Sequence, residues 1–125
     1  MEFLKKFRNW KDVEEHPAET VIFPEGNLAD HLYVILSGEV ELSLRGNPLE
    51  VEKSGGFIGE MALFESAARS ATATALTDVK LARLDRDQLA ALMYESTEFS
   101  LQIMAVLANR LRAVNEYLAT SLGPA

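Results

Sequence analysis

Residues 57–71 have the sequence FIGEMALFESAARSA, and this order of apolar, small and charged residues predicts a specific local structure. Phe57 and Ile58 are apolar and typical of the end of a strand, and Gly59 allows a sharp change of direction that other residues resist. Residues 60–64 can then form one short helical turn. The segment therefore predicts a strand, a tight turn and a short helix.

A loop of small residues follows the short helix and ends in a single cation, Arg69, beside Ser70 and before a new strand at Ala71. The first backbone N–H groups of a helix have no internal partner, and the helix dipole adds partial positive charge there. Arginine adds a planar fork that can hold two phosphate oxygens. Glu60 would repel a phosphate, so its natural partner is a hydroxyl of the same ligand, such as that of a ribose. The segment therefore indicates a nucleotide site.

A plainer interpretation of the same residues remains open at this point. Glu60 and Arg69 could form an ion pair across an ordinary connection between two strands. Exposed pairs of this kind are common and contribute roughly 0–1 kcal/mol to stability.

The segment resembles the phosphate-binding cassette of the cyclic nucleotide-binding domain, which occurs in bacterial regulators, protein kinase regulatory subunits and gated ion channels. That family has a phenylalanine, then Gly-Glu, small or apolar residues, a short loop and Arg-(Ser/Ala/Thr)-Ala. The matching positions here are Phe57, Gly59, Glu60, Ala62, Leu63, Arg69, Ser70 and Ala71. Ala68 is a departure, since many members have proline before the arginine.

The resemblance implies a role for several of these residues. Arg69 would hold the cyclic phosphate and Glu60 the ribose 2′-hydroxyl, while Ser70 and the backbone of residues 59–61 would complete the site. The ligand implied is cAMP or cGMP, with no metal ion and no catalytic residue. The full set of implied ligand-binding residues is Phe57, Ile58, Gly59, Glu60, Met61, Ala62, Arg69, Ser70, Ala71 and Asn115.

The base-binding positions depart from the family. In the bacterial regulators, two adjacent hydroxyl residues of the last helix typically hydrogen-bond the adenine amino group. Alignment through Arg110 and Leu111 puts Val114 and Asn115 at these positions. A valine side chain can neither donate nor accept a hydrogen bond, whereas Asn115 can do both, from either subunit. The choice between cAMP and cGMP stays open.

The composition limits the classes of protein that are possible. A chain of 125 residues fits one domain, 1–125, and its formal charge of −7 argues against a nucleic-acid surface. There is no cysteine, and His16 and His31 do not have metal-binding spacing. No run of about 18 apolar residues and no signal peptide are visible, so we expect a cytoplasmic protein.

The amino-terminal segment, 1–18, is expected to be helical. Its apolar residues recur at helical spacing among basic ones and are Phe3, Leu4, Phe7 and Trp10. Such a segment could lie on a membrane surface, but packing on the flank of the domain explains the same pattern. We predict the packed helix.

The middle of the chain, residues 19–84, is typical of short antiparallel strands. Val40, Leu42 and Leu44 alternate with polar residues, as expected of a strand with one buried face. Turn residues recur between such segments, and residues 85–122 then have helical patterns. We therefore predict a mainly β fold with flanking helices (α+β), an antiparallel β-roll or jelly roll of about eight strands.

Two helices are expected at the carboxyl end. Asp85 and Gln88 have the spacing of a capping box and begin a helix that runs to about Tyr94. A longer helix ends near Leu122, where the Gly-Pro pair at 123–124 is a stop signal.

The long helix also carries an apolar seam. Its residues are spaced 3, 4, 3 and 4 apart and are Met104, Leu107, Leu111, Val114 and Leu118. This is the geometry of two helices that wind together, whereas a helix that only covers its own roll needs a wider stripe. Leu101, Ile103 and Val106 could supply that wider stripe. We predict both uses, with the first turns packed on the roll and the later ones in a homodimer.

Together these patterns predict a cyclic nucleotide sensor domain that couples ligand binding to movement of the last helix and of a dimer or partner surface. The alternative is an interaction module that kept the fold and lost the ligand. An enzyme with Glu60 as a base is disfavoured, because no metal ligands, nucleophile–base pair or second catalytic acid is visible. The related regulators continue into a DNA-binding helix-turn-helix that this sequence lacks. We therefore expect a free-standing sensor, or the sensory part of a larger protein, that does not bind DNA.

Overall fold

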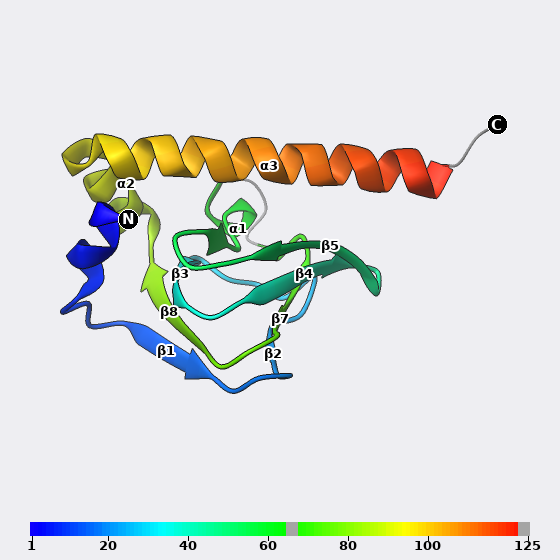
Figure 1. The fold of residues 1–125 in the computed structure, drawn as a ribbon, viewed down its shortest axis with the longest axis horizontal. Coiled ribbons are helices and arrows are strands. Elements are labelled where there is room, and N and C mark those ends of the chain that lie inside the picture. The colour runs from blue at the N-terminus through cyan, green and yellow to red at the C-terminus, as the bar shows by residue number, and fades with distance from the viewer. Residues whose placement is uncertain (65–67, 123–125) are drawn as a thin grey trace.

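The computed structural model describes residues 1–64 and 68–122, which form eight strands in two antiparallel sheets with helices at both ends (Figure 1). In spatial order, the first sheet contains β1 (Val13–His16), β8 (Val79–Leu84), β3 (Leu32–Ser37) and β6 (Phe57–Ile58). The second sheet contains β2 (Val21–Phe23), β7 (Thr72–Ala75), β4 (Val40–Leu44) and β5 (Asn47–Glu52). The predicted fold class, an antiparallel roll of eight strands with flanking helices, is confirmed.

The helices lie mostly on one side of the roll. They are the 3-10 helix η1 (Glu2–Phe7), α1 (Met61–Phe64), α2 (Arg86–Glu95) and α3 (Thr97–Leu122). Helix α3 runs along the roll, η1 and α2 lie at its amino-terminal end, and its last turns extend past the β4–β5 hairpin (Figure 1). The predicted capping box is present, because Asp85 and Gln88 exchange two hydrogen bonds of 2.8 and 2.9 Å.

Part of the cassette loop, residues 65–67, and the predicted stop signal at 123–124 lie outside the described residues.

Strand β3 separates two apolar cores. Leu32 and Val34 belong to the core that faces the helices, whereas Tyr33 and Ile35 belong to the core between the two sheets. Successive side chains of a strand point to opposite faces, and here both faces are covered. This explains why residues 32–36 are a continuous apolar run rather than an alternating one.

The amino-terminal aromatic residues pack on the domain itself, as predicted. Phe3 and Phe7 are buried, and their ring centroids lie 5.4 and 6.5 Å from that of Phe99 in α3. The indole N–H of Trp10 donates a hydrogen bond of 2.9 Å to the carbonyl of Arg83. This contact ties the segment to the end of β8.

The predicted boundary between the helical segment 1–18 and the roll is wrong. Helix η1 ends at Phe7, and β1 already pairs with β8 from Val13↔Ala82 to His16↔Val79. Strand β1 could not be recognised from the sequence because its residues, VEEH, include two acids and a histidine and lack an apolar alternation. It lies at the free edge of a sheet. One of its acids is satisfied by a residue far away in sequence, since the Tyr33 hydroxyl donates to Glu14 at 2.9 Å.

Candidate functional site

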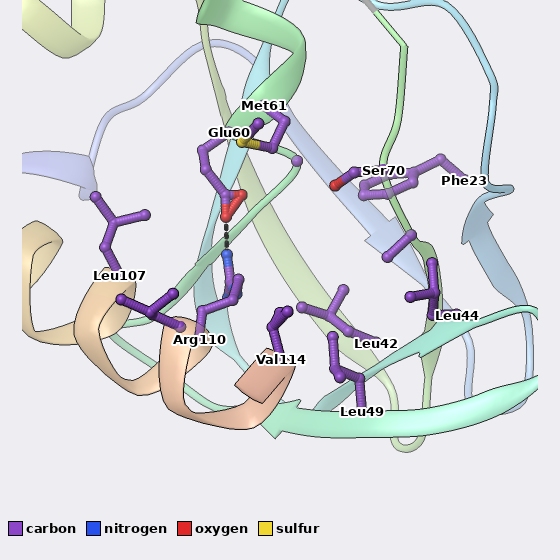
Figure 2. Close-up of a pocket in the computed structure, with 13 residues that line it drawn as sticks. Phe23, Leu42, Leu44, Leu49, Glu60, Met61, Ser70, Leu107, Arg110 and Val114 are labelled. Atoms are coloured by element: carbon purple, nitrogen blue, oxygen red, sulfur yellow. Dashed lines mark hydrogen bonds and ion pairs between the residues drawn. The ribbon is translucent and has the colours of Figure 1, made fainter. Parts of the chain in front are cut away.

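A cavity of about 380 Å³ opens between the second sheet, the cassette and α3 (Figure 2). The sheet contributes Phe23, Leu42, Leu44 and Leu49. The cassette contributes Gly59, Glu60, Met61, Ser70 and Ala71. Helix α3 contributes Leu107, Arg110, Leu111 and Val114. The cavity is therefore polar where the cassette meets Arg110 and apolar elsewhere.

The cassette has the local structure that its sequence predicts. Strand β6 (Phe57–Ile58) is buried and pairs with β3, which fixes the start of the turn. Gly59 follows with a φ of +81°, in the left-handed region that side chains resist, and α1 begins two residues later. A Cβ at residue 59 would also overlap Nη1 of Arg69. The backbone conformation thus favours glycine here, and any side chain would also displace the guanidinium of Arg69.

Five of the ten predicted ligand-binding residues line the cavity: Gly59, Glu60, Met61, Ser70 and Ala71. The structure places the other five elsewhere. Phe57, Ile58 and Ala62 are buried and do not line the cavity, and Asn115 is exposed on α3. Arg69 is buried on the far side of the Gly59 turn.

Arg69 points toward backbone carbonyls rather than into the cavity. Its Nη1 donates hydrogen bonds to the carbonyls of His31 at 2.6 Å and Gly59 at 2.9 Å, and its guanidinium lies 4.2 Å from the Phe23 ring centroid. Burial lowers the pKa of Arg69. Its Nε is buried and has no hydrogen-bond partner among the described residues. Arg69 therefore keeps an unused donor, which normally costs about 1–3 kcal/mol.

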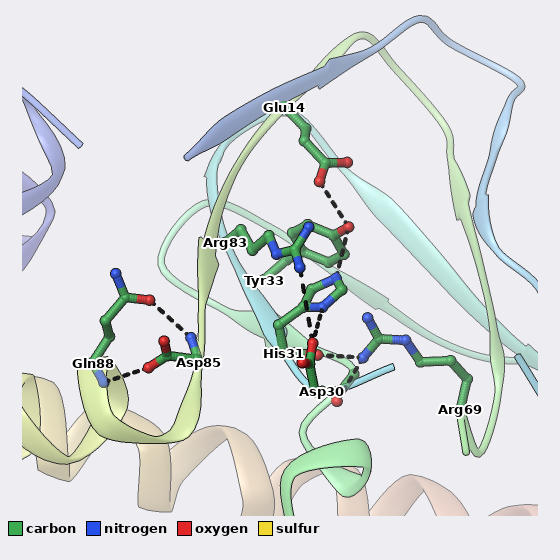
Figure 3. A network of polar contacts seen from close by, with 9 residues as sticks. Glu14, Asp30, His31, Tyr33, Arg69, Arg83, Asp85 and Gln88 are labelled. Carbon is green, nitrogen blue, oxygen red and sulfur yellow. Dashed lines mark hydrogen bonds and ion pairs between the residues drawn. The ribbon is translucent and has the colours of Figure 1, made fainter. Parts of the chain in front are cut away.

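A polar network surrounds His31, whose backbone carbonyl accepts a hydrogen bond from Arg69 (Figure 3). The His31 ring lies 3.1 Å from the Tyr33 hydroxyl and 3.2 Å from a carboxylate oxygen of Asp30. Burial lowers the pKa of His31, and burial together with Glu14 raises the pKa of Tyr33 to about 12. The carbonyl that anchors Arg69 is thus fixed by side chains of the first sheet.

Arg110 of α3 makes the most extensive polar contacts of the site. Its Nη1 donates to Glu60, its Nε donates to Glu50 at 2.6 Å, and its Nη2 donates to the carbonyl of Phe57 at 2.7 Å. A carboxylate oxygen of Glu52 lies 3.2 Å from Nη2. Glu60 is therefore paired with Arg110 (Figure 2), and not with Arg69 as the plainer interpretation of the sequence proposed.

Three carboxylates around one guanidinium leave an excess of negative charge. Burial, followed by the neighbouring Glu50, raises the pKa of Glu52 to about 7, although Arg110 opposes the shift. Burial alone would lower the pKa of Arg110, but Glu60, Glu50 and Glu52 outweigh it and raise that pKa. The cluster thus holds Arg110 charged and leaves one carboxyl easily protonated.

Arg110 is not among the site residues predicted from the sequence, although the sequence carries a signal for its role. The buried residues of α3 before it are Phe99, Ile103 and Val106, at spacings of 4 and 3, and Arg110 follows after 4 more. An arginine that continues a buried helical stripe must meet acceptors or anions. Its partners, Glu50 and Glu52, stand two apart on β5 and hence on one face of that strand.

The two predicted uses of α3 can be compared with its burial. Ile103 and Val106 pack on the core, which confirms that the first turns cover the roll. Leu101 was wrongly assigned to this covering face, because it is 60% exposed. Of the predicted seam, four residues are at least 43% exposed and Val114 is half-buried: Met104, Leu107, Leu111 and Leu118 are the exposed ones.

The fold combines two antiparallel sheets with a glycine turn, a short helix and an adjoining cavity under a long helix. The family model for the cyclic nucleotide-binding domain matches residues 13–96, from the first residue of β1. The chain therefore belongs to the cyclic nucleotide-binding domain family, and the resemblance found in the sequence is confirmed.

Two curated relatives are a transcriptional regulator and a kinase regulatory subunit. The chain is 34% identical over 110 residues to a CRP-like cAMP-activated global transcriptional regulator of Mycobacterium tuberculosis, a match that covers 84% of this chain and 49% of the relative. It is 38% identical over 78 residues to a cAMP-dependent protein kinase regulatory subunit of Aspergillus niger, covering 61% and 19% respectively. The chain thus spans about half the length of the first of these relatives.

Solved structures share the fold. The catabolite activator protein of Thermus thermophilus is 30% identical with a TM-score of 0.69, covering 94% of this chain and 57% of its own. The c-di-GMP-responsive global regulator CLP of Xanthomonas campestris is 25% identical with a TM-score of 0.78, covering 92% and 61%. In the described part of this chain, no helix combines the length and the apolar character needed to cross a bilayer.

The raised pKa of Glu52 should make the stability of the fold depend on pH. Its pKa is about 7 in the fold against an ordinary 4.5, so the folded state binds the proton more tightly than the unfolded state. Stability from this group is present below the unfolded value and is lost as pH rises through about 7. In urea unfolding between pH 5 and 8, Glu52→Gln should gain stability relative to wild type as pH rises, whereas exposed Glu116→Gln should not. A difference that stays constant with pH would contradict this assignment.

Arg110→Ala should loosen α3. The change leaves three carboxylates of the site without their cation, which typically costs about 3–5 kcal/mol when the pair is buried. We expect faster amide exchange in α3 beyond residue 107, while the turn around buried Phe99 stays protected. Arg112→Ala is the matched control, because Arg112 is exposed on the same helix and bonds only Asn109 among the described residues. Equal exchange in both variants would refute the role of Arg110.

Proposed function

We propose that this chain is a cyclic nucleotide sensor, in which cAMP or cGMP binds in the cavity and binding is coupled to the position of α3. The observation that carries this proposal is the contact between Glu60 and Arg110. The cassette residue suited to a ribose hydroxyl is at the same time a partner of the long helix. A ligand that engages Glu60 therefore acts on a group that holds α3.

The cavity suits a ligand of this class. Its volume of about 380 Å³ lies within the usual range for small-molecule sites, about 300–1,000 Å³. The sugar and cyclic phosphate would occupy the cassette side, near Glu60, Ser70 and the backbone of residues 59–61. The base would occupy the side formed by the second sheet and α3, where the walls are apolar.

Arg69 would reach the phosphate by turning from the carbonyls that it now contacts. Those carbonyl bonds are between a cation and neutral acceptors, and bonds to a phosphate are stronger because both partners are charged. The unpaired Nε supports this proposal, since it is a donor that a phosphate oxygen can satisfy. Because one of the present acceptors is the Gly59 carbonyl, the same movement would act on the turn that carries Glu60.

Coupling then follows from differential binding. A ligand shifts α3 only if it binds one position of the helix more tightly than another. Leu107, Leu111 and Val114 of α3 line the base side of the cavity, and Arg110 lies on the sugar side. Each position of α3 thus offers the ligand a different wall, so affinity and helix position are linked.

We also propose that the exposed seam of α3 pairs with a second copy of the chain. Met104 and Leu111 are 63% and 62% exposed, although both are large apolar residues at seam spacing. Pairing would cover them and would place the cavity next to the interface, because Leu107, Leu111 and Val114 belong to both. Ligand binding would then be communicated across the dimer.

One observation favours the alternative, an interaction module without a ligand. Arg69 is turned away from the cavity, so among the described lining residues the cation is Arg110, which three carboxylates already surround. A ligand titration separates the two functions.

Calorimetric titration with cAMP and with cGMP tests the proposed function. We expect a dissociation constant of about 1 µM or lower for at least one of them. Arg69→Lys keeps the charge but loses the fork, and should weaken binding by at least about tenfold. Arg69→Ala should abolish binding, but Arg69 is buried, so Arg69→Lys and a melting curve are needed to separate lost binding from lost folding. No binding of either nucleotide by a folded wild-type protein would favour the interaction module.

The dimer is tested by light scattering after size-exclusion chromatography. Leu118→Glu puts a charge in the seam but outside the cavity lining, and should convert a dimer into a monomer. Leu101→Glu is the matched control, because Leu101 is 60% exposed on the same helix and lies off the seam. A wild-type monomer at about 100 µM would contradict the proposed pairing.

A further inference from the structure

The part of the cavity away from the cassette has only apolar side chains in its described lining (Figure 2). The second sheet supplies Leu42, Leu44 and Leu49 there, and α3 supplies Leu107, Leu111 and Val114. The charged or hydroxyl side chains of the described lining are Glu60, Arg110 and Ser70, and all of them border the cassette side. A base on the apolar side therefore meets methyl and methylene groups.

Neither candidate for a hydrogen bond to the base is placed to make one within this chain. Val114 lines the cavity and has no donor or acceptor in its side chain. Asn115, the next residue, is exposed on α3 and is absent from the described lining. Arg110 already has partners at all three of its nitrogens, since Nε donates to Glu50, Nη1 to Glu60 and Nη2 to the carbonyl of Phe57.

We infer that this site holds a purine by its apolar faces and does not recognise the exocyclic groups of the base. The inference rests on the proposed function and specifies its ligand class. That class is the 3′,5′-cyclic purine ribonucleotides as a group, selected by sugar and cyclic phosphate. Discrimination among them comes from the cost of burying polar groups without partners.

In an apolar site, affinity should not rise with the number of exocyclic polar groups on the base. Burying an unpaired donor or acceptor typically lowers affinity by about tenfold, less where the edge stays in contact with water. Adenine has one exocyclic polar group and guanine has two, whereas unsubstituted purine has none. A site that hydrogen-bonds an exocyclic group shows the opposite behaviour, because its own buried polar groups lose their partner when the ligand lacks that group.

The test is a calorimetric comparison of cAMP, cGMP and the 3′,5′-cyclic monophosphate of unsubstituted purine riboside. The unsubstituted purine nucleotide, which lacks the amino group of cAMP, should bind no more than about threefold more weakly than cAMP. Likewise, cGMP should not bind more tightly than cAMP. A loss of about tenfold or more for the unsubstituted purine, or a preference of that size for cGMP, overturns the inference. If none of the three binds, the proposed function itself fails, and the inference fails with it.

Variants on β5 test whether the base occupies the apolar side of the cavity. Leu49→Ala should lower the affinities for the three ligands by the same factor, because it removes an apolar contact that does not depend on the exocyclic group. Val51→Ala is the matched control on the same strand, since Val51 is 44% exposed and absent from the described lining. A Leu49→Ala effect limited to one nucleotide overturns the inference.

Asn115→Ala addresses a contribution from a second copy of the chain. If the inference holds, the ratio of the three affinities stays as in the wild type. A changed ratio would assign recognition of the base to Asn115 of a partner, and the inference would be wrong.

Discussion

The ion pairs of Arg110 join three parts of the molecule that are distant in sequence. They connect α3 to two acids of β5 and to the cassette acid Glu60. A buried guanidinium without these partners would be unfavourable, and so would the three carboxylates without it. Helix, strand and cassette therefore depend on one another at this point. The contact lies at the edge of the cavity, because Glu60 and Arg110 both line it.

Arg69 makes a second set of contacts that joins distant parts of the chain. The Gly59 turn is held by Arg69 from behind, through a bond to its own carbonyl, and Arg69 is held in turn by the carbonyl of His31. Phe23 lies against both the guanidinium and the cavity. A change at Arg69 would therefore affect Phe23 of the second sheet and His31, which precedes β3. Residues that line the cavity, such as Phe23, are also part of the core between the two sheets.

Local chemistry explains what could be predicted from the sequence. The order of the cassette residues determines a strand, a glycine turn and a short helix, and the capping box fixes the start of α2. The remaining features depend on contacts between distant residues. Nothing near Arg69 in sequence shows that the carbonyl of His31 will accept its hydrogen bond, and nothing near Glu14 shows that Tyr33 will satisfy it. Arg110 could be suspected from its helical stripe, but its partners follow only from the position of β5.

Helix α3 consists of two halves with different mechanical character. Up to Val106 its inner face belongs to the main core, whereas beyond Arg110 the helix is largely exposed and extends past the β4–β5 hairpin (Figure 1). Local opening costs least where few apolar groups are buried. Opening of the outer half would therefore disrupt fewer apolar contacts than opening of the inner half, and it would leave the main core intact.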